Sequence, residues 1–310
     1  MEGSTALDGA DPAHSTAPIG WRLRLPEDRE LHVGGRTLVM GIVNLTPDSF
    51  SDGGRFESPD DAVAAALEML RDGADLLDLG AESTRPGGGV YGEGAREVPW
   101  QEEWRRLEPA LRSLREATDA PLSVDTRKAA VARRALEAGA DVVNDVSALA
   151  DPDMAPLLAA SEAPVVLMHS RGELATMQRG IAFDDVVAEV RGELGQAIAA
   201  AEDAGIDSGR IVVDPGLGFG KTRDQNLRLL AELPELRALG RPILVGASRK
   251  SFLRTRRDEP PAERIYGSLA AAAWAASRGA DIVRVHDVAA TVRLIETWRA
   301  IAAAGAGGDV

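Results

Sequence analysis

Eight short apolar runs recur along this chain, and each is followed by a segment with the hydrophobic period of an amphipathic helix. Apolar runs of this length, bounded by turn residues, predict buried strands, and their alternation with helices predicts parallel βα units. Eight such units in roughly 270 residues fit a (β/α)8 TIM barrel. The expected strands are residues 38–43, 75–79, 122–124, 141–143, 164–168, 211–213, 242–245 and 282–285.

The helices are expected over residues 58–71, 100–117, 128–137, 152–160, 184–204, 224–233, 263–277 and 289–304. Ser58-Pro59 is typical of a helix start, with an N-cap and a proline at the first position. A phrase ending in Gly-Ala-Asp recurs at 72–75, 137–141 and 278–281, which indicates a repeated device for ending a helix. A doubly wound sheet is the competing fold, but no dinucleotide-binding glycine fingerprint follows the first strand.

The barrel accounts for nearly the whole chain. Residues 1–18 are rich in Ala, Gly, Ser, Thr, Asp and Pro and are expected to form a disordered tail. Residues 21–25 alternate at period two and are followed by residues 30–33, which predicts a short N-terminal hairpin. We therefore expect one domain over residues 19–304 and a frayed end over 305–310.

The amino-acid composition limits the kinds of site and partner that this chain can have. Cysteine is absent and histidine occurs four times, which excludes thiolate chemistry and disfavours a multi-histidine metal cage. A net charge of −14 argues against nucleic acid as a partner. The sequence contains neither an 18-residue apolar run nor a secretory signal pattern, so we expect a cytoplasmic protein with no membrane partner.

Polar residues stand where each expected strand ends. In a barrel the carboxyl ends of the strands converge on one face, so these side chains are expected to meet in one cleft. Any single Asp or Asn of this kind is more often a turn or helix cap, and Asp145 and Asp287 are good candidates for that role. The presence of polar residues at all eight expected strand ends is not explained by caps alone. The residues are Asn44, Asp78, Asp125-Thr126, Asn144-Asp145, His169, Asp214, Ser248–Ser251 and His286-Asp287.

Cationic side chains gather near the last two strands. Arg284 and His286 are two residues apart on one strand, so they face the same way, and Arg249 and Lys250 follow the strand before it. In an acidic protein this concentration suits a phosphate or diphosphate group. Hard oxygen ligands such as Asn44 are the available metal ligands, and they suit Mg²⁺ that arrives with substrate phosphates.

Asp125, Asn144 and Asp214 form a second group, which supplies acceptors and one amide to a buried pocket. A carboxylate that accepts two parallel N–H groups can bind the edge of a guanidine-like heterocycle. The run Gly216–Thr222 approaches a P-loop but has three residues where the motif requires four. The chain also lacks the Gly-x-Ser-x-Gly elbow of a serine nucleophile.

These segments, in this order, resemble those of the dihydropteroate synthase family. The resemblance covers roughly residues 36–300, and it rests on the segments Gly41–Gly54, Asp78–Gly87, Ser123–Thr126, Asn144-Asp145, Met168-His169, Asp214–Lys221, Ser248–Ser251 and Arg284–Val288. It implies a transferase of folate biosynthesis that condenses 6-hydroxymethyl-7,8-dihydropterin diphosphate with p-aminobenzoate, giving 7,8-dihydropteroate and diphosphate. It also implies a homodimer that uses Mg²⁺ and is a target of sulfonamides.

The resemblance also implies roles for individual residues. It places Asp125, Asp214 and Lys250 at the reacting pterin as catalytic residues, with Asn144 holding the same ring and Met168 in the substrate pocket. Asn44 would meet the Mg²⁺–diphosphate, with Arg284 and His286 on the same group. Thr84, Arg85 and Pro86, together with Phe219 and Ser251, would complete the p-aminobenzoate site.

The resemblance implies a mechanism without a protein nucleophile. Loss of diphosphate would leave a cation on the pterin methylene, which Asp125 and Asp214 would favour before the arylamine attacks. The chain departs from the family at Ser170, where a bulky residue is often found. A pterin-binding methyltransferase barrel would not need the Arg284/His286 pair, and a non-catalytic pterin-binding paralogue would be expected to lose loop or diphosphate residues.

Overall fold

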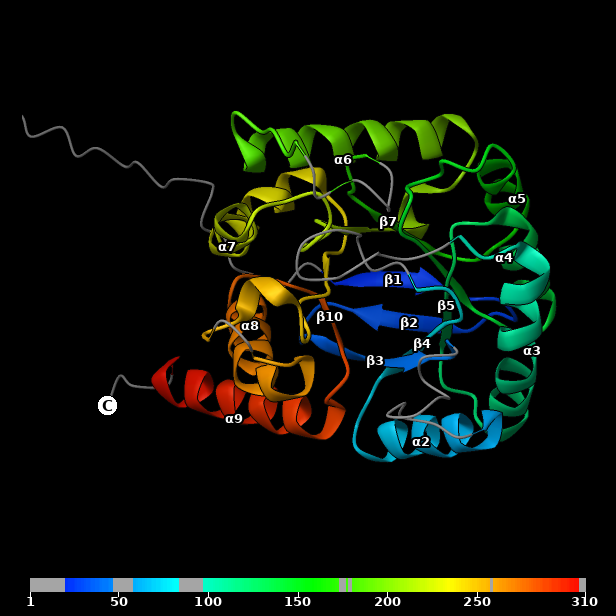
Figure 1. Ribbon diagram of the computed structural model, residues 1–310, viewed down its shortest axis with the longest axis horizontal. Helices are drawn as coiled ribbons and strands as arrows, with labels where there is room; N and C mark the ends of the chain where they lie inside the picture. Colours follow the sequence, from blue (N-terminus) through cyan, green and yellow to red (C-terminus); the bar gives the residue numbers. More distant parts are fainter. Residues whose placement is uncertain are drawn as a thin grey trace, which may run out of the picture.

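The computed structural model describes residues 20–46, 58–83, 97–172, 177, 180–256 and 259–306. Its centre is a nearly closed barrel of eight parallel strands, which confirms the predicted fold class (Figure 1). The sheet order is β8-β7-β6-β5-β4-β3-β10-β9, and a parallel bridge between Val213 and Ile243 joins its two ends. The barrel strands are β3 (Leu38–Asn44), β4 (Leu76–Gly80), β5 (Leu122–Asp125), β6 (Val142–Asp145), β7 (Val165–Met168), β8 (Ile211–Asp214), β9 (Leu244–Val245) and β10 (Ile282–Val285).

Helices form a ring around these strands (Figure 1). Their apolar faces cover the outer surface of the barrel, where they build a continuous core with strand residues such as Val43, Leu79 and Val124. The helices are α2 (Pro59–Arg71), α3 (Trp100–Ala117), α4 (Ala129–Glu137), α5 (Met154–Ala160), α6 (Val186–Asp203), α7 (Arg223–Ala231), α8 (Ile265–Ser277) and α9 (Val288–Ala306).

One helix begins at its predicted N-cap, whereas two other helices end at residues that differ from the predicted ones. Ser58 is the N-cap of α2, and its hydroxyl accepts a hydrogen bond from the backbone N–H of Asp61. The helix predicted over 224–233 ends earlier, because Pro234 lacks the N–H needed to continue it, and a 3-10 helix follows at η4 (Leu233–Leu239). The C-terminal helix continues to Ala306, beyond the start of the predicted fray.

The recurring Gly-Ala-Asp phrases have two functions in the structure. Their glycines adopt positive φ angles of 99°, 98° and 89° at Gly73, Gly139 and Gly279, as a helix stop requires. Their aspartates do something that the sequence did not predict. Each accepts a hydrogen bond from a backbone N–H at the start of the neighbouring strand.

The three pairings repeat one geometry at the amino-terminal end of the barrel. Asp75 accepts from Val39 N at 2.8 Å, Asp141 from Leu122 N at 2.8 Å, and Asp281 from Ile243 N at 2.7 Å. An arginine pairs with each of these carboxylates, respectively Arg36, Arg115 and Arg237. A charge-assisted bond therefore fixes where three of the strand pairs begin.

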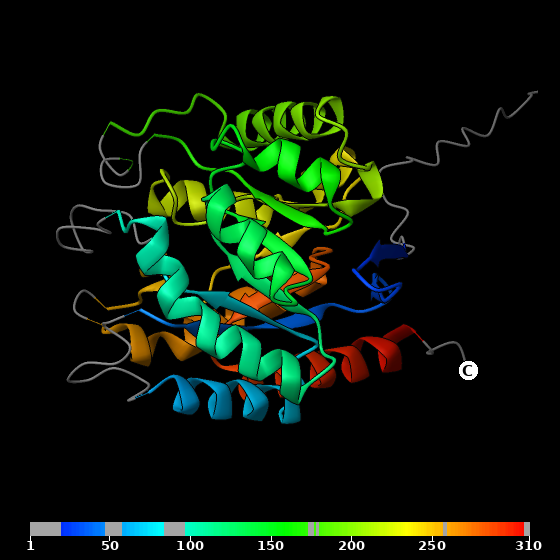
Figure 2. The ribbon, with the colours of Figure 1, turned by 90° about the vertical axis from the view of Figure 1, so that its right-hand side faces the viewer.

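The N-terminal hairpin closes the same end of the barrel interior. It consists of β1 (Trp21–Arg24) and β2 (Glu30–Val33), paired antiparallel, and lies to the right of the barrel in Figure 2. Leu23, Leu25 and Val33 are buried against inward-facing residues of the strands. With this end filled, the open end available for a ligand is the one where the strands terminate.

Candidate active site

A buried ion-pair network spans the carboxyl ends of the strands. Arg284 on β10 donates from Nε to Asp78 on β4 at 2.5 Å and from a terminal nitrogen to Asp125 on β5 at 2.9 Å. Asn144 on β6 donates to the same oxygen of Asp78 at 3.1 Å. Four side chains from four strands therefore meet inside the barrel, as the convergence of strand ends predicts.

Three buried side-chain oxygens in or beside this network have no hydrogen-bond partner within the described part of the chain. They are Asp78 Oδ1, Asp125 Oδ1 and Ser123 Oγ, and all three atoms are buried. A buried acceptor without a donor costs free energy, so the pocket is matched to a ligand that brings N–H groups. The strand end beside Asp125 is Gly80, where a Cβ would make an ordinary van der Waals contact with Asp125 Cβ at 3.5 Å.

Asp214 is the last residue of β8, and a compact loop follows it. One of its carboxylate oxygens accepts from Gly216 N at 2.7 Å, and the residue is almost fully buried. Lys250 lies above this loop, donates to the carbonyl oxygen of Leu217, and places its ammonium 4.6 Å from the centre of the Phe219 ring. The structure therefore brings Asp214, Lys250 and Phe219 together, as the sequence predicts.

Burial shifts the protonation equilibria of these groups. It raises the pKa of Asp125 to about 7 although Arg284 opposes the shift, and it raises the pKa of Asp214 against the effect of Lys250. Burial lowers the pKa of Lys250 to about 8, with Asp214 opposing. Strongly shifted carboxyl and amino groups that share one pocket are typical of an active site.

The remaining strand-end residues lie around this pocket. Asn44 ends β3 half-buried, and Ser251 begins the 3-10 helix η5 (Ser251–Leu253). Nδ1 of His286 lies 3.0 Å from the hydroxyl of Ser248. Met168 packs with Phe219 in a small apolar cluster next to the pocket. The predicted residues Thr84, Arg85 and Pro86 lie outside the described residues.

Asp287 and Arg249 form a contact that their expected roles did not include. The carboxylate of Asp287, expected to cap a turn or helix, forms an ion pair with Arg249 at 2.5 Å. The guanidinium of Arg249 is therefore paired with a carboxylate, whereas the sequence analysis grouped it with the cationic side chains expected to bind phosphate. Asp145 acts as expected, because its carboxylate accepts from the backbone N–H groups of Ser147 and Leu149.

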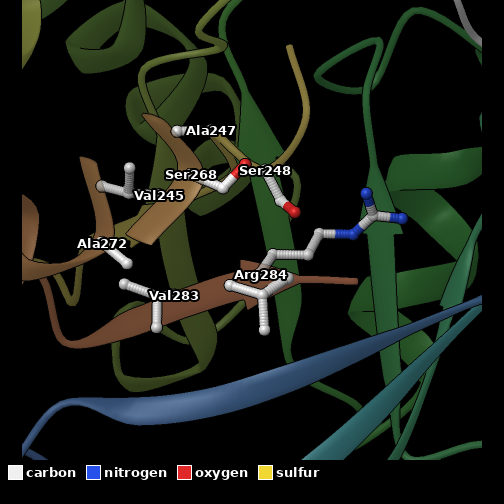
Figure 3. Close-up of a pocket in the computed structure, with 8 residues that line it drawn as sticks. Val245, Ala247, Ser248, Ser268, Ala272, Val283 and Arg284 are labelled. Carbon is white, nitrogen blue, oxygen red and sulfur yellow. The ribbon is translucent and has the colours of Figure 1, made fainter. Parts of the chain in front are cut away.

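A small hollow lies beside the pocket, between β9, β10 and α8. Figure 3 shows Arg284 extending past Ser248 and away from the apolar wall of Val245, Ala272 and Val283. The hollow therefore contacts the aliphatic part of Arg284, whereas its guanidinium belongs to the ion-pair network.

Sequence reasoning missed several functional contacts. It placed Asp78 at a strand end but did not foresee that this residue pairs with Arg284, and it assigned Ser123 no acceptor role. It rejected Lys221 as a P-loop lysine without identifying what its ammonium binds. The only sequence signal for Ser123 is its i+2 spacing from Asp125, which places both side chains on one face of β5.

The described residues contain no cluster of three His, Asp or Glu side chains able to hold a metal ion. In the same part of the chain, no helix is long and apolar enough to cross a membrane.

Comparison with known families shows to which family the chain belongs. The model of the family "Pterin binding enzyme" matches residues 40–286. The chain belongs to the pterin-binding enzyme family. The dihydropteroate synthase of Synechocystis is 46% identical over 272 residues, which cover 86% of this chain and 92% of that protein.

Solved structures of dihydropteroate synthases agree with this assignment. Those from Xanthomonas albilineans with 4-aminobenzoic acid and with 7,8-dihydropteroate superpose with TM-scores of 0.83 and 0.80, at 48% and 46% identity. They cover 92% and 91% of this chain, and 99% of each solved chain is covered in return. The Yersinia pestis enzyme with a sulfonamide drug gives a TM-score of 0.84 at 41% identity, covering 91% of this chain and 99% of that one.

Within the pterin-binding enzymes, this chain is a transferase of the dihydropteroate synthase type, so the predicted family and enzyme class are confirmed. The match to the family model begins within β3, at Met40, and ends at His286, directly after β10. All eight strands of the pterin-binding barrel therefore fall within or overlap the matched region. The N-terminal hairpin lies outside it.

Proposed function

We propose that this chain condenses 6-hydroxymethyl-7,8-dihydropterin diphosphate with p-aminobenzoate to form 7,8-dihydropteroate and diphosphate. The observation that carries the proposal is the set of buried acceptors without donors, at Asp78, Asp125 and Ser123. A dihydropterin presents an amidine-like edge of N–H groups, which is the complement that such a pocket lacks. The full-length similarity to dihydropteroate synthases supports the same reaction.

In this proposal the pterin ring binds between Asp125, Asn144 and Asp214. Their position inside the barrel excludes water from the ring and strengthens each charge-assisted hydrogen bond. As the bond to diphosphate breaks, positive charge develops on the pterin methylene, and the ionised carboxylates of Asp125 and Asp214 stabilise it. Lys250 interacts with Asp214 and Asp125 and contacts Phe219, so its ammonium is placed to orient the ring.

The second substrate is assigned to the region around Phe219. The Phe219 ring packs with Met168 and lies under Lys250, which offers an apolar wall and a nearby cation for an aromatic carboxylate. Ser251, Thr84, Arg85 and Pro86 are assigned to the same site from the family resemblance. The arylamine nitrogen of p-aminobenzoate attacks the methylene carbon, and its excess proton leaves to solvent.

We further propose that Mg²⁺ enters with the diphosphate and is bound by Asn44. The side chain of Asn44 ends β3 at the rim of the pocket and offers the oxygen ligand that Mg²⁺ prefers. When bound, the ion neutralises charge on the leaving group. His286 and Arg284 are assigned to the same diphosphate, Arg284 through a rearrangement of its present ion pairs.

A homodimer is also proposed. Among the described residues, the large exposed apolar side chains are Tyr266, Trp274, Trp298 and Ile301, and all four lie on α8 and α9. These two helices lie next to each other on one side of the barrel (Figure 1). An exposed apolar surface of this kind suits contact with a second copy of the chain. Sedimentation of the wild-type protein and of Trp298→Glu tests this arrangement.

The function is tested by mixing purified protein with the pterin diphosphate, p-aminobenzoate and Mg²⁺ and measuring the release of diphosphate and the formation of dihydropteroate. Omission of p-aminobenzoate or chelation of Mg²⁺ should stop product formation. Pterin binding without diphosphate release would favour a methyltransferase barrel or a non-catalytic binding protein. The cytoplasmic location expected from the sequence stays a prediction.

A further inference from the structure

A buried lysine that the proposed reaction does not use lies under the loop after β8. Lys221 is only 3% exposed. Its ammonium nitrogen lies 3.0 Å from the carbonyl oxygen of Gly216, 3.0 Å from that of Phe219, and 2.8 Å from Nδ1 of His169. An ammonium has three N–H donors and no acceptor, so its hydrogen-bonding capacity matches these three neighbours.

His169 connects this lysine to the neighbouring helix. Its other ring nitrogen, Nε2, lies 2.9 Å from a carboxylate oxygen of Glu193 on α6. Glu193 in turn accepts from Nε of Arg171 at 2.9 Å. Because Nδ1 faces the lysine and Nε2 faces a carboxylate, the matching form is the neutral imidazole with its proton on Nε2. The chain of contacts therefore runs from α6 through β7 to the loop.

The loop rests directly on the segment that carries His169. A Cβ on Gly216 would lie 1.8 Å from the carbonyl oxygen of His169, and one on Gly220 would lie 2.9 Å from that of Arg171. Both glycines adopt positive φ angles, 63° and 61°. The backbone of the loop therefore lies close against the segment that follows β7, and Lys221 links the two through Gly216 and His169.

Asp214 is fixed by a different contact. Its backbone carbonyl oxygen accepts from His169 N at 2.9 Å as part of the pairing between β7 and β8. Phe219, by contrast, lies outside the pairing of β7 and β8, and its carbonyl oxygen accepts directly from Lys221. The Asp214 carboxylate also accepts from Gly216 N, and Lys221 binds the carbonyl oxygen of that glycine, but the strand pairing holds the Asp214 backbone. Loss of the ammonium would therefore displace Phe219 more than Asp214.

We propose that Lys221 and His169 are positioning residues that hold the Pro215–Gly220 loop so that Phe219 forms the wall of the site for the aromatic second substrate. This role rests on the proposed function, since it assigns Phe219 to p-aminobenzoate. It differs from that of a P-loop lysine, because the ammonium binds the protein's own carbonyl groups instead of a phosphate.

The first test measures the tautomer of His169 in the full-length protein. The chain has four histidines, so ¹⁵N labelling of histidine gives a spectrum that His169→Gln can assign. We expect His169 to be neutral and protonated at Nε2 between pH 6 and 8. Protonation at Nδ1 would overturn the proposal, because that nitrogen could not then accept from Lys221.

The second test separates the two substrates. Lys221→Met should raise the KM for p-aminobenzoate by about tenfold or more through loss of its charge-assisted bonds, while the Kd of an unphosphorylated pterin, measured by calorimetry, changes by less than about twofold. Arg237→Met is the matched control. It removes contacts with Asp281 and Gly279 at the opposite end of the barrel and should lower stability without changing either parameter.

Equal weakening of both ligands in Lys221→Met, or no change in either, would overturn the proposal. Failure of the proposed function would look different. In that case the wild-type protein would release no diphosphate, and the tautomer of His169 together with direct calorimetry of p-aminobenzoate would still test the positioning role.

Discussion

Asp78 and Arg284 are 206 positions apart in the chain, and they form a 2.5 Å ion pair in the interior of the barrel. Asp78 is fully buried, and the same oxygen also accepts from Asn144. The pair joins β4 to β10 across the pocket. It holds the guanidinium beside Asp125 before any ligand binds.

Removal of one partner should therefore be costly. Asp78→Ala leaves Arg284 with Asp125 as its remaining carboxylate, so we expect the free energy of unfolding to fall by about 3–5 kcal/mol. Urea denaturation followed by circular dichroism measures it. Glu108→Ala breaks an exposed pair with Arg112 and should cost under about 1 kcal/mol. Similar losses in both variants would show that the buried pair has no special role.

His286 gives a cleaner test of the diphosphate assignment than Arg284, which also stabilises two carboxylates. His286→Ala should weaken use of the pterin diphosphate by about 1.5–3 kcal/mol, the usual worth of a charge-assisted hydrogen bond. Steady-state kinetics at varied pterin diphosphate gives the change in kcat/KM. An unphosphorylated pterin should bind as tightly as before, and parental turnover in this variant would place the diphosphate elsewhere.

Asp214 and Phe219 share one loop but are assigned to different substrates. Asp214→Asn places an amide donor against the N–H edge of the ring and should abolish pterin binding in calorimetry. Phe219→Leu should leave that binding unchanged and weaken p-aminobenzoate or a sulfonamide by about 0.5–1.5 kcal/mol. Loss of both ligands in both variants, with a lower Tm, would mean that these residues only shape the loop.

The pKa of about 7 at Asp125 gives activity and stability opposite pH dependences. If the ionised carboxylate stabilises the pterin cation, kcat/KM should rise with pH through about 7, and Asp125→Asn should lose that rise along with most activity. The free energy of unfolding changes with pH in the opposite direction, because the pKa of Asp125 is higher in the folded than in the unfolded state. Below pH 4 both states are protonated, and stability falls as pH rises from about 4 to 7.

Thermal or urea unfolding at pH 5 and pH 8 checks the stability half of this prediction. Relative to the wild type, Asp125→Asn should be more stable at pH 8 than at pH 5, because it removes the cost of a buried charge. Identical pH dependences for the two proteins would mean that Asp125 is ionised at ordinary pH in both the folded and the unfolded state.

The sequence predicted the architecture well because its signals are local. A buried strand and an amphipathic helix each have a period that can be read within one segment, and parallel strands bring their ends to one face whatever the loops do. Asp125, Asn144 and Asp214 could therefore be assigned to one pocket before their distances were known.

Pairings across the barrel could not be predicted in this way. Whether Arg284 reaches Asp78 or a substrate depends on the register and side-chain direction of strands far apart in sequence. The same limit applies to Asp287, which directly precedes α9 as the local pattern predicts but also pairs with Arg249, which that pattern did not predict. Lys221 has three partners because two loops lie in contact, and no spacing within either loop contains that information.

The aspartates of the Gly-Ala-Asp phrases divide the barrel into modules. Asp75, Asp141 and Asp281 each precede a strand and accept from a backbone N–H at or next to the start of the strand before it in sequence. They so close the pairs β3–β4, β5–β6 and β9–β10. In β7–β8 an arginine takes this place, since Arg210 donates to the carbonyl oxygen of Ala163 at 3.3 Å. In a chimera with a related barrel, a crossover after β4, β6 or β8 would leave both partners of each closing bond in segments from the same parent protein. A crossover inside one of the strand pairs would take the two partners of its closing bond from different parent proteins.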